Sequence, residues 1–187
     1  MSTIADMNKT IELKKIAHEI ESCRICKQNK SGKAVAGEGN TDANIVFLGE
    51  APGREEAKTG RPFVGRSGKL LRLLIRDMGL KEEDVYITSP VKYLPDRGTP
   101  TREDIVHGRI HLFKQLDIIA PKLIVLLGKT AAKAMLDQDI PIMKEHGKII
   151  IHKGRRYFLT LHPAAAVRLQ KFRPLLEADF NVLKRLV

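Results

Sequence analysis

The sequence is short of aromatic residues and of cysteine. It contains no tryptophan, aromatic residues make up 5% of its 187 positions, and there are two cysteines. The scarcity of aromatics weakens any interpretation as a protein that stacks a series of unpaired bases. No apolar run reaches the roughly 20 residues that a membrane span requires. The start of the chain, MSTIADMNKT, carries no apolar signal core, so we expect a cytoplasmic protein with no membrane partner.

Acidic residues are also fewer than basic residues. Lys and Arg number 33 against 22 Asp and Glu, which gives a formal net charge of +11. This excess favours a polyanionic partner, with nucleic acid as the first candidate and a generally basic proteome as the alternative explanation. Hydrophobic residues make up 43% of the chain, enough for a proper core. We therefore expect one domain over residues 1–187.

Apolar runs of strand length alternate with segments of helical periodicity. The expected strands are NIVFLG, DVYITS, KLIVLLG and RRYFLTL, the last preceded by KIIIH in a hairpin. The expected helices are 8–22, with Asn8 as its cap and Ile11, Ile16 and Ile20 on one side, then 67–79, 102–119, 128–137 and 173–186. Thr101 and Asp104 form a capping box for the third helix. This alternation predicts a three-layer α/β/α sandwich around a short central parallel sheet.

Unusual residues follow the strands. In such sheets ligands bind beyond the carboxyl ends of the strands, and here these ends read LGEAPG, ITSPVK, LLGKT and LTLHPAAAV. Glu50 stands at the first end, where the glycines and Pro52 let a backbone approach a ligand closely; a tight turn without ligand is the alternative. His162 stands at the last, where its position favours a functional role over a structural one.

A Gly/Pro-rich loop follows the first strand. Phe63 in GRPFVGRSGKLL either stacks on a planar ligand or anchors the loop. The helix that opens at Gly65 to Gly68 presents amides suited to a phosphate, and GKTAA at 128–132 repeats the arrangement. The spacing of a P-loop is absent.

The two cysteines form a CxxC pair, Cys23 and Cys26. Such a pair is half of a metal or iron–sulfur site, or a redox pair. The redox interpretation requires a preceding strand, which we do not expect. A cluster requires two more thiolates, which the chain does not contain.

Taken together and in order, GEAPG, GRPFVGRSGKLL, YITSPVK, LIVLLGKTAA and LHPAAAVR resemble the family 4 uracil-DNA glycosylases of bacteria and archaea. The resemblance extends from Cys23 to nearly the C-terminus. It implies a uracil-DNA glycosylase fold and a DNA repair enzyme that flips uracil out of DNA, hydrolyses its N-glycosidic bond and leaves an abasic site. The resemblance leaves open whether other deaminated bases are also substrates.

The resemblance also implies roles for individual residues. Glu50 would position water near the reacting sugar, and His162 would hydrogen-bond uracil O2 as negative charge develops there. The base-binding residues would be Ala51, Gly53, Glu56 as a support of the loop, Phe63 and Ser89. The DNA contacts would be Ser67, Lys69, Lys92, Lys129 and Arg168, the last on an HPAAAVR loop that enters the minor groove.

Two departures from the family pattern stand out. Ser89 replaces an asparagine whose amide reads the edge of uracil. Tyr93 and Gly108 stand where the other two cluster cysteines belong, and His107 is next to the second. We therefore expect no cofactor and no intact four-iron cluster, with Cys23 and Cys26 as remnant ligands.

Two other functions compete with the enzyme. A non-catalytic DNA-binding relative would explain the lost asparagine and cysteines, but the retention of Glu50, Phe63 and His162 favours catalysis. A phosphate-handling nucleotide enzyme is disfavoured because no metal-binding cluster of carboxylates is present. We expect a monomer acting on DNA that contains uracil or another deaminated base.

Overall fold

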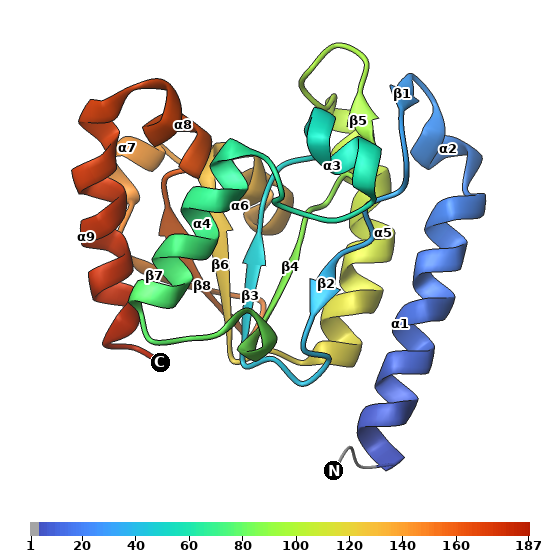
Figure 1. Ribbon diagram of the computed structural model, residues 1–187, viewed down its shortest axis with the longest axis horizontal. Helices are drawn as coiled ribbons and strands as arrows, with labels where there is room; N and C mark the ends of the chain where they lie inside the picture. The colour runs from blue at the N-terminus through green and yellow to red at the C-terminus, as the bar shows by residue number, and fades with distance from the viewer. Residues whose placement is uncertain (1–3) are drawn as a thin grey trace.

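The computed structural model describes residues 4–187, with side chains from Met7 onward. Its centre is a six-stranded sheet in the order β2-β4-β3-β6-β8-β7 (Figure 1). The strands are β2 Glu38–Gly39, β3 Ile45–Leu48, β4 Val85–Thr88, β6 Leu123–Leu127, β7 Ile149–His152 and β8 Arg155–Thr160. The four inner strands are parallel, and the edge strands β2 and β7 pair antiparallel. The parallel sheet and the β7–β8 hairpin are as predicted.

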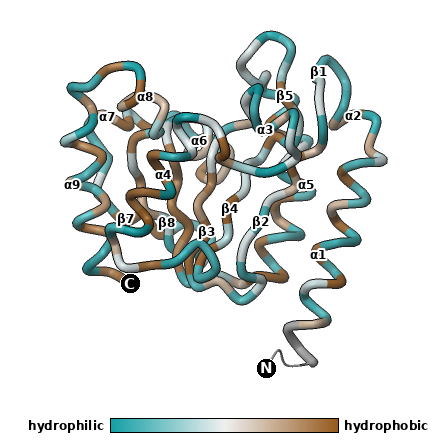
Figure 2. The backbone as a smooth tube through the Cα atoms, viewed as in Figure 1, coloured by the Kyte–Doolittle hydropathy of each residue, from teal (hydrophilic) through white to brown (hydrophobic). Residues whose placement is uncertain are grey.

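Helices cover both faces of this sheet. The long ones are α1 Ile4–Ser22, α4 Arg66–Asp77, α5 Arg102–Ile119, α6 Gly128–Leu136 and α9 Arg173–Lys184. Strand β3 shows how the layers form, because its side chains alternate between faces. Val46 and Leu48 pack in the core that contains α1, α5 and α6, whereas Ile45 and Phe47 pack in the core with α4 and α9. The apolar residues concentrate along the strands and the inner sides of the helices (Figure 2), which confirms the three-layer α/β/α prediction.

The short elements lie mainly around the carboxyl ends of the parallel strands. They are α2 Arg24–Lys27, α3 Arg54–Thr59, α7 Ile142–Glu145, α8 Pro163–Arg168 and two 3-10 turns, Glu82–Asp84 and Gln170–Phe172. A separate two-stranded sheet pairs β1 Lys30–Ser31 with β5 Leu94–Pro95. This pairing holds the segment after the CxxC motif against the loop that follows β4.

The first helix differs from the prediction at its start and on its buried side. It begins at Ile4, so Asn8 lies inside it and is not its cap. Ile11 is 49% exposed, whereas Leu13, Ile16 and Ile20 are buried. Spacings of three and four residues place the last three on one face, and Ile11 falls outside that stripe.

The starts of α5 and α8 both carry sequence signals that favour a helix. The capping box of α5 is confirmed, since Thr101 Oγ1 accepts from Asp104 N at 3.1 Å and Asp104 Oδ2 accepts from Thr101 N at 2.9 Å. The HPAAAVR segment, expected as a loop, is the helix α8. Pro163 is preorganised for its first position and the alanines favour helix. Within residues 4–187 no helix is both long and apolar enough to cross a membrane.

Candidate active site

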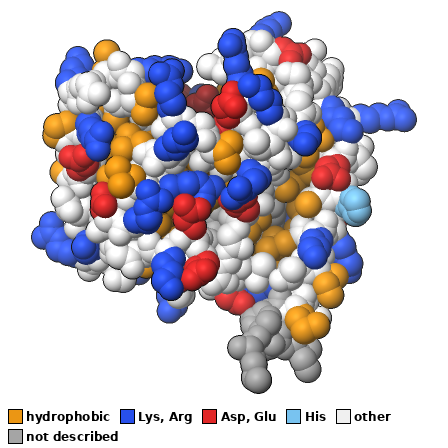
Figure 3. Space-filling view, viewed as in Figure 1, with side chains coloured by type: hydrophobic (Ala, Val, Ile, Leu, Met, Phe, Trp, Pro, Cys, Tyr) orange, Lys and Arg blue, Asp and Glu red, His pale blue; other side chains and the backbone are white. Residues whose placement is uncertain are grey.

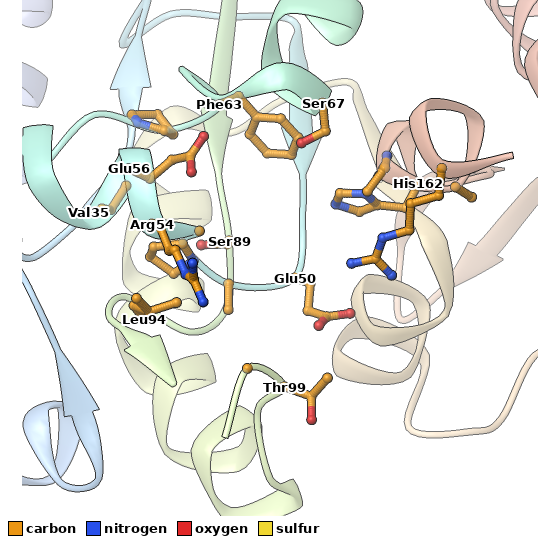
Figure 4. A pocket seen from close by; sticks show the side chains of 18 residues that line it. Val35, Glu50, Arg54, Glu56, Phe63, Ser67, Ser89, Leu94, Thr99 and His162 are labelled. Atoms are coloured by element: carbon orange, nitrogen blue, oxygen red, sulfur yellow. Dashed lines mark hydrogen bonds between the residues drawn. The ribbon is translucent and has the colours of Figure 1, made fainter. Parts of the chain in front are cut away.

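A cavity of about 600 Å³ opens beyond the carboxyl ends of the inner strands. Glu50, Ser89 and His162 follow β3, β4 and β8 and all line it, so the strand-end residues meet as their positions predicted. Figure 3 shows a hollow at this edge of the molecule with Lys and Arg side chains on both sides. The wall also includes Ala51, Gly53, Arg54, Glu56, Phe63, Ser67, Thr99 and Arg168, and Figure 4 shows how the labelled side chains surround the space.

The loop between β3 and α4 is held from beneath by Glu56. This carboxylate is 9% exposed, and its Oε1 accepts from the backbone amides of Val64 and Gly65, both at 2.8 Å. Charge-assisted hydrogen bonds of this kind are among the strong ones in proteins. Glu56 therefore holds the loop through the backbone amides of Val64 and Gly65.

Phe63 occupies a strained position in this loop. Its φ is +52°, a conformation that a bulky residue adopts only where its surroundings demand it. The ring lies so close to Gly49 that a Cβ there would meet it at 2.7 Å, and its centroid is 5.8 Å from that of His162. Arg72 holds the backbone from behind, since its Nε donates to Phe63 O at 3.1 Å. The strain thus serves to present the ring to the cavity.

Glu50 is oriented by a residue that the sequence reasoning missed. Thr130, at the start of α6, donates from Oγ1 to Glu50 Oε2 at 2.6 Å. One carboxylate oxygen is thereby fixed, and the other remains available for a ligand in the cavity. Thr130 belongs to the GKT motif that follows β6. From the sequence, Lys129 of this motif was expected to contact DNA, and no role was predicted for Thr130.

His162 caps α8 with its own ring. The backbone N–H of Ala164 donates to His162 Nδ1 at 3.1 Å. Burial lowers the pKa of His162 to about 4; the positive charge of Arg168 acts in the same direction and Glu56 opposes it. The imidazole is therefore neutral near pH 7. Because Nδ1 accepts a hydrogen bond, the single ring proton resides on Nε2.

Gly128 makes room for this histidine. It has a φ of +86°, and a Cβ there would come within 2.9 Å of the Cβ of His162. Only glycine satisfies both the left-handed backbone and the close approach. The glycine that follows β6 is thus a packing partner of the catalytic candidate that follows β8.

Ser89 lies at the cavity wall with its proton already in use. It is 6% exposed, and its hydroxyl donates to Val91 O at 2.7 Å. A hydroxyl has a single proton, so toward the cavity Ser89 offers only acceptor lone pairs.

Lys92 corrects one of the expected DNA contacts. This side chain is 2% exposed, and its Nζ donates to Thr88 Oγ1 at 2.7 Å, to Gln115 Oε1 at 2.7 Å and to Ala36 O at 3.0 Å. All three ammonium protons are satisfied inside the protein, so Lys92 cannot reach a phosphate. It joins the loop before β2, the end of β4 and helix α5.

The other expected DNA contacts are accessible. Ser67 stands in the first turn of α4 at the cavity, Lys69 is exposed on the same helix, and Arg168 is exposed at the end of α8. Lys129 is exposed on α6 with Asp139 Oδ1 3.6 Å from its Nζ. Arg54, at the start of α3, is exposed on the cavity wall and was missed.

The CxxC pair is not part of the cavity wall. Its two cysteines instead lie close to two histidines of α5. One ligand atom from each of Cys23, Cys26, His107 and His111 lies within 4.8 Å of the others. Only His107 had been noticed from the sequence, although His111 follows it at helical spacing. Position 108 bears no side chain and Tyr93 supplies a phenol, so the four thiolates of a four-iron cluster are not available here.

The fold and cavity define an α/β/α protein that holds a carboxylate, an aromatic ring and a neutral imidazole around one cavity at the carboxyl edge of its sheet. Residues 36–184 match the sequence model of the Uracil DNA glycosylase superfamily. The chain belongs to this superfamily, and its similarity to several type-4 enzymes places it in that branch.

Three relatives show the extent of this similarity. The type-4 uracil-DNA glycosylase of Sulfurisphaera tokodaii is 41% identical over 93% of this chain and 84% of its own length. That of Thermotoga maritima is 43% identical over 82% of each chain. That of Archaeoglobus fulgidus is 38% identical over 91% of each. The similarity therefore covers at least 82% of both chains in each pair.

Proposed function

We propose that this protein hydrolyses the N-glycosidic bond of uracil in DNA, as the names of its type-4 relatives indicate for them. One observation carries the proposal. The oriented carboxylate of Glu50, the ring of Phe63 and the neutral imidazole of His162 line one cavity whose volume suits a flipped nucleotide.

His162 would act on the leaving base. Cleavage leaves negative charge on the departing uracil, and a preorganised donor aimed at the developing charge typically supplies a few kcal/mol. The Nε2 proton is the only ring proton of the neutral imidazole, and Nδ1 is occupied by the Ala164 amide. Nε2–H is therefore the group that donates to uracil O2.

Glu50 would act on the sugar side of the same bond. As the bond breaks, the sugar acquires positive character, which a nearby carboxylate stabilises electrostatically. Thr130 holds Oε2 at 2.6 Å, which leaves Oε1 to orient the attacking water. The scissile bond thus has a negative carboxylate on its sugar side and a neutral hydrogen-bond donor on the side of the leaving base.

Phe63 and Ser89 would recognise the base. The Phe63 ring offers a face for stacking. Ser89 presents an acceptor to a base that has a ring N–H beside a carbonyl, as uracil does at N3. Cytosine has an acceptor at that position, so two acceptors would face each other and the pairing is disfavoured. This pattern also admits hypoxanthine, whose ring N–H has the same polarity.

Exposed basic residues on α3, α4, α6 and α8 would hold the DNA backbone. The candidates are Lys69, Lys129, Arg54 and Arg168, together with Ser67 and the amides that open α4. Arg168 at the end of α8 is placed to enter the gap that a flipped nucleotide leaves. Phosphate contacts position the duplex but carry no sequence information, in keeping with a repair enzyme.

The test is excision from oligonucleotides that carry one uracil, single- or double-stranded, followed by alkali cleavage of the abasic site. We expect cleavage by the wild-type protein and a loss on the order of 100-fold or more in His162→Ala under single-turnover conditions. Binding should persist in the variant because phosphate contacts supply most of the affinity. Tight DNA binding without excision by the wild-type protein would identify a non-catalytic relative instead.

A further inference from the structure

Two thiols and two imidazoles converge between α2 and α5, away from the base cavity. The nearest pair is Cys23 Sγ and His107 Nε2 at 3.1 Å, and the four ligand atoms of the group all lie within 4.8 Å of one another. Cys26 and His111 are 6% and 7% exposed. Among the described residues, the buried Nδ1 of His111 has no hydrogen-bond partner; the nearest carboxylate oxygen, Glu19 Oε2, is 3.7 Å away.

The local structure of both segments orients the four side chains. In the CxxC turn the Cys26 amide donates to Cys23 Sγ at 3.4 Å, and the sulfurs of both cysteines lie within 4.8 Å of each other. His107 and His111 are four residues apart on α5, so their rings share a face of the helix; their centroids are 5.8 Å apart. The group is therefore built by two elements that converge on one point.

We infer that Cys23, Cys26, His107 and His111 bind a single zinc ion in a closed, tetrahedral, structural site. Zn–S bonds of about 2.3 Å and Zn–N bonds of about 2.0–2.1 Å imply ligand separations of roughly 3.3–3.8 Å. The observed group is within about an ångström of that arrangement, which side-chain rotation can supply. The C-x2-C and H-x3-H spacings are those of structural Cys2His2 zinc sites.

A four-iron cluster does not fit this group. Such a cluster is held by four cysteine thiolates, and the chain has two cysteines. A side chain cannot be restored at position 108, because a Cβ on Gly108 would lie 2.1 Å from the backbone oxygen of Pro90. At position 93 the tyrosine is buried, and its hydroxyl lies 3.5 Å from Ile20 O. Both positions are committed to packing.

A two-iron cluster with two cysteines and two histidines also fails. In that type the two cysteines bind one iron and the two histidines bind the other, so the iron pair separates sulfur from nitrogen ligands. Here a sulfur and an imidazole nitrogen, those of Cys23 and His107, are 3.1 Å apart. That contact is what one shared ion requires.

The ion would connect the N-terminal segment to the loop that reads the base. Helix α5 carries both histidines, and its Gly108 packs against the backbone of Pro90, the residue after Ser89. The cysteines follow α1 and precede β1. The ion would join the CxxC segment to α5 and so fix the position of α5, against which the loop after Ser89 packs. Its role would be structural and not catalytic.

The experiment measures the metal directly. The 187-residue chain is expressed with both iron and zinc available, purified anaerobically without chelator, and analysed for metals and acid-labile sulfide. We expect about one zinc ion per chain and neither iron nor sulfide in stoichiometric amount. Cys23→Ser and His111→Ala should lose the zinc, whereas His18→Ala, a matched histidine on α1 with a side chain 87% exposed, should keep it.

Cobalt substitution tests the ligand set without relying on variants that fold poorly. Wild-type protein stripped with a chelator and refilled with Co²⁺ should show the visible bands of a tetrahedral ion and thiolate-to-cobalt charge transfer in the near ultraviolet. Removal of the ion should lower Tm. Stoichiometric iron with sulfide, a protein that takes up neither zinc nor cobalt, or a cobalt spectrum without charge transfer would each overturn the inference. None of these readouts depends on glycosylase activity.

Discussion

The amide of Ala164 donates a hydrogen bond to Nδ1 of His162 at 3.1 Å. This contact settles what the sequence left open, because it is compatible with only one neutral tautomer, the one with its proton on Nε2. The same geometry disfavours the doubly protonated ring, in which an Nδ1–H would face an amide N–H. Burial then lowers the pKa of His162 to about 4.

The titration of His162 should therefore occur well below that of an ordinary histidine. We expect ring ¹⁵N and ¹³C NMR signals of the Nε2–H tautomer at pH 7, with a midpoint near pH 4. The assignment comes from comparison with His162→Asn. A midpoint near 6.5, the usual imidazole value, would show that the ring is solvated and that the proposed tautomer does not hold.

The same pKa shift predicts how stability depends on pH. The folded-state pKa lies below the unfolded value of about 6.5, so the unfolded state binds more protons between these two values. The stabilising contribution is fully present above about pH 6.5 and is lost as pH falls toward 4. Urea unfolding should show wild-type protein losing more stability than His162→Asn over this window. Parallel curves for the two proteins would contradict the shift.

Thr130 should matter for catalysis and little for the fold. Thr130→Val removes the hydrogen bond to Glu50 at nearly constant volume, and a lost hydrogen bond to a charged group is worth about 1.5–3 kcal/mol. We expect uracil excision to slow by roughly 10- to 100-fold under single-turnover conditions. Thr130→Ser, which keeps the hydroxyl, is the matched control and should retain most of the rate. Equal rates for the valine and serine variants would remove Thr130 from the positioning of Glu50.

Measurements of DNA binding and of unfolding should distinguish the exposed lysines from the buried Lys92. Lys69→Ala and Lys129→Ala should weaken DNA binding and reduce its salt dependence by about one charge each, with unchanged unfolding. Lys92→Met should do the reverse, because it removes three internal hydrogen bonds and no phosphate contact. A reduced salt slope in Lys92→Met would mean that this side chain leaves its buried site on DNA.

How much the sequence revealed differs between the strand ends and the loops. Glu50 and His162 were found because each follows a strand, and parallel strands bring their ends to one edge. Lys92 was misassigned because nothing local marks it as buried; its partners Ala36 and Gln115 lie 56 and 23 residues away. His111 was overlooked although its spacing to His107 was visible, since its meaning depends on the distant CxxC pair.

Ser89 gives the sharpest test of base recognition. Its hydroxyl proton is committed to Val91 O at 2.7 Å, so it can accept from uracil N3–H but cannot donate to O4. An asparagine amide offers both a donor and an acceptor. Leaving O4 unpaired in a desolvated cavity costs about 1–3 kcal/mol, which corresponds to roughly 5- to 150-fold in rate.

Ser89→Asn should therefore raise uracil excision by up to that factor. It should lower excision of hypoxanthine relative to uracil, because the longer asparagine side chain leaves less room for a purine. Ser89→Ala, which removes the acceptor and frees Val91 O, is the control and should slow both reactions. The rates are compared on matched oligonucleotides that differ only in the target base, under single-turnover conditions. Ser89→Asn could instead leave unchanged both the uracil excision rate and the ratio of the excision rates for the two bases. Another group would then read the base edge, and Ser89 would only line the cavity.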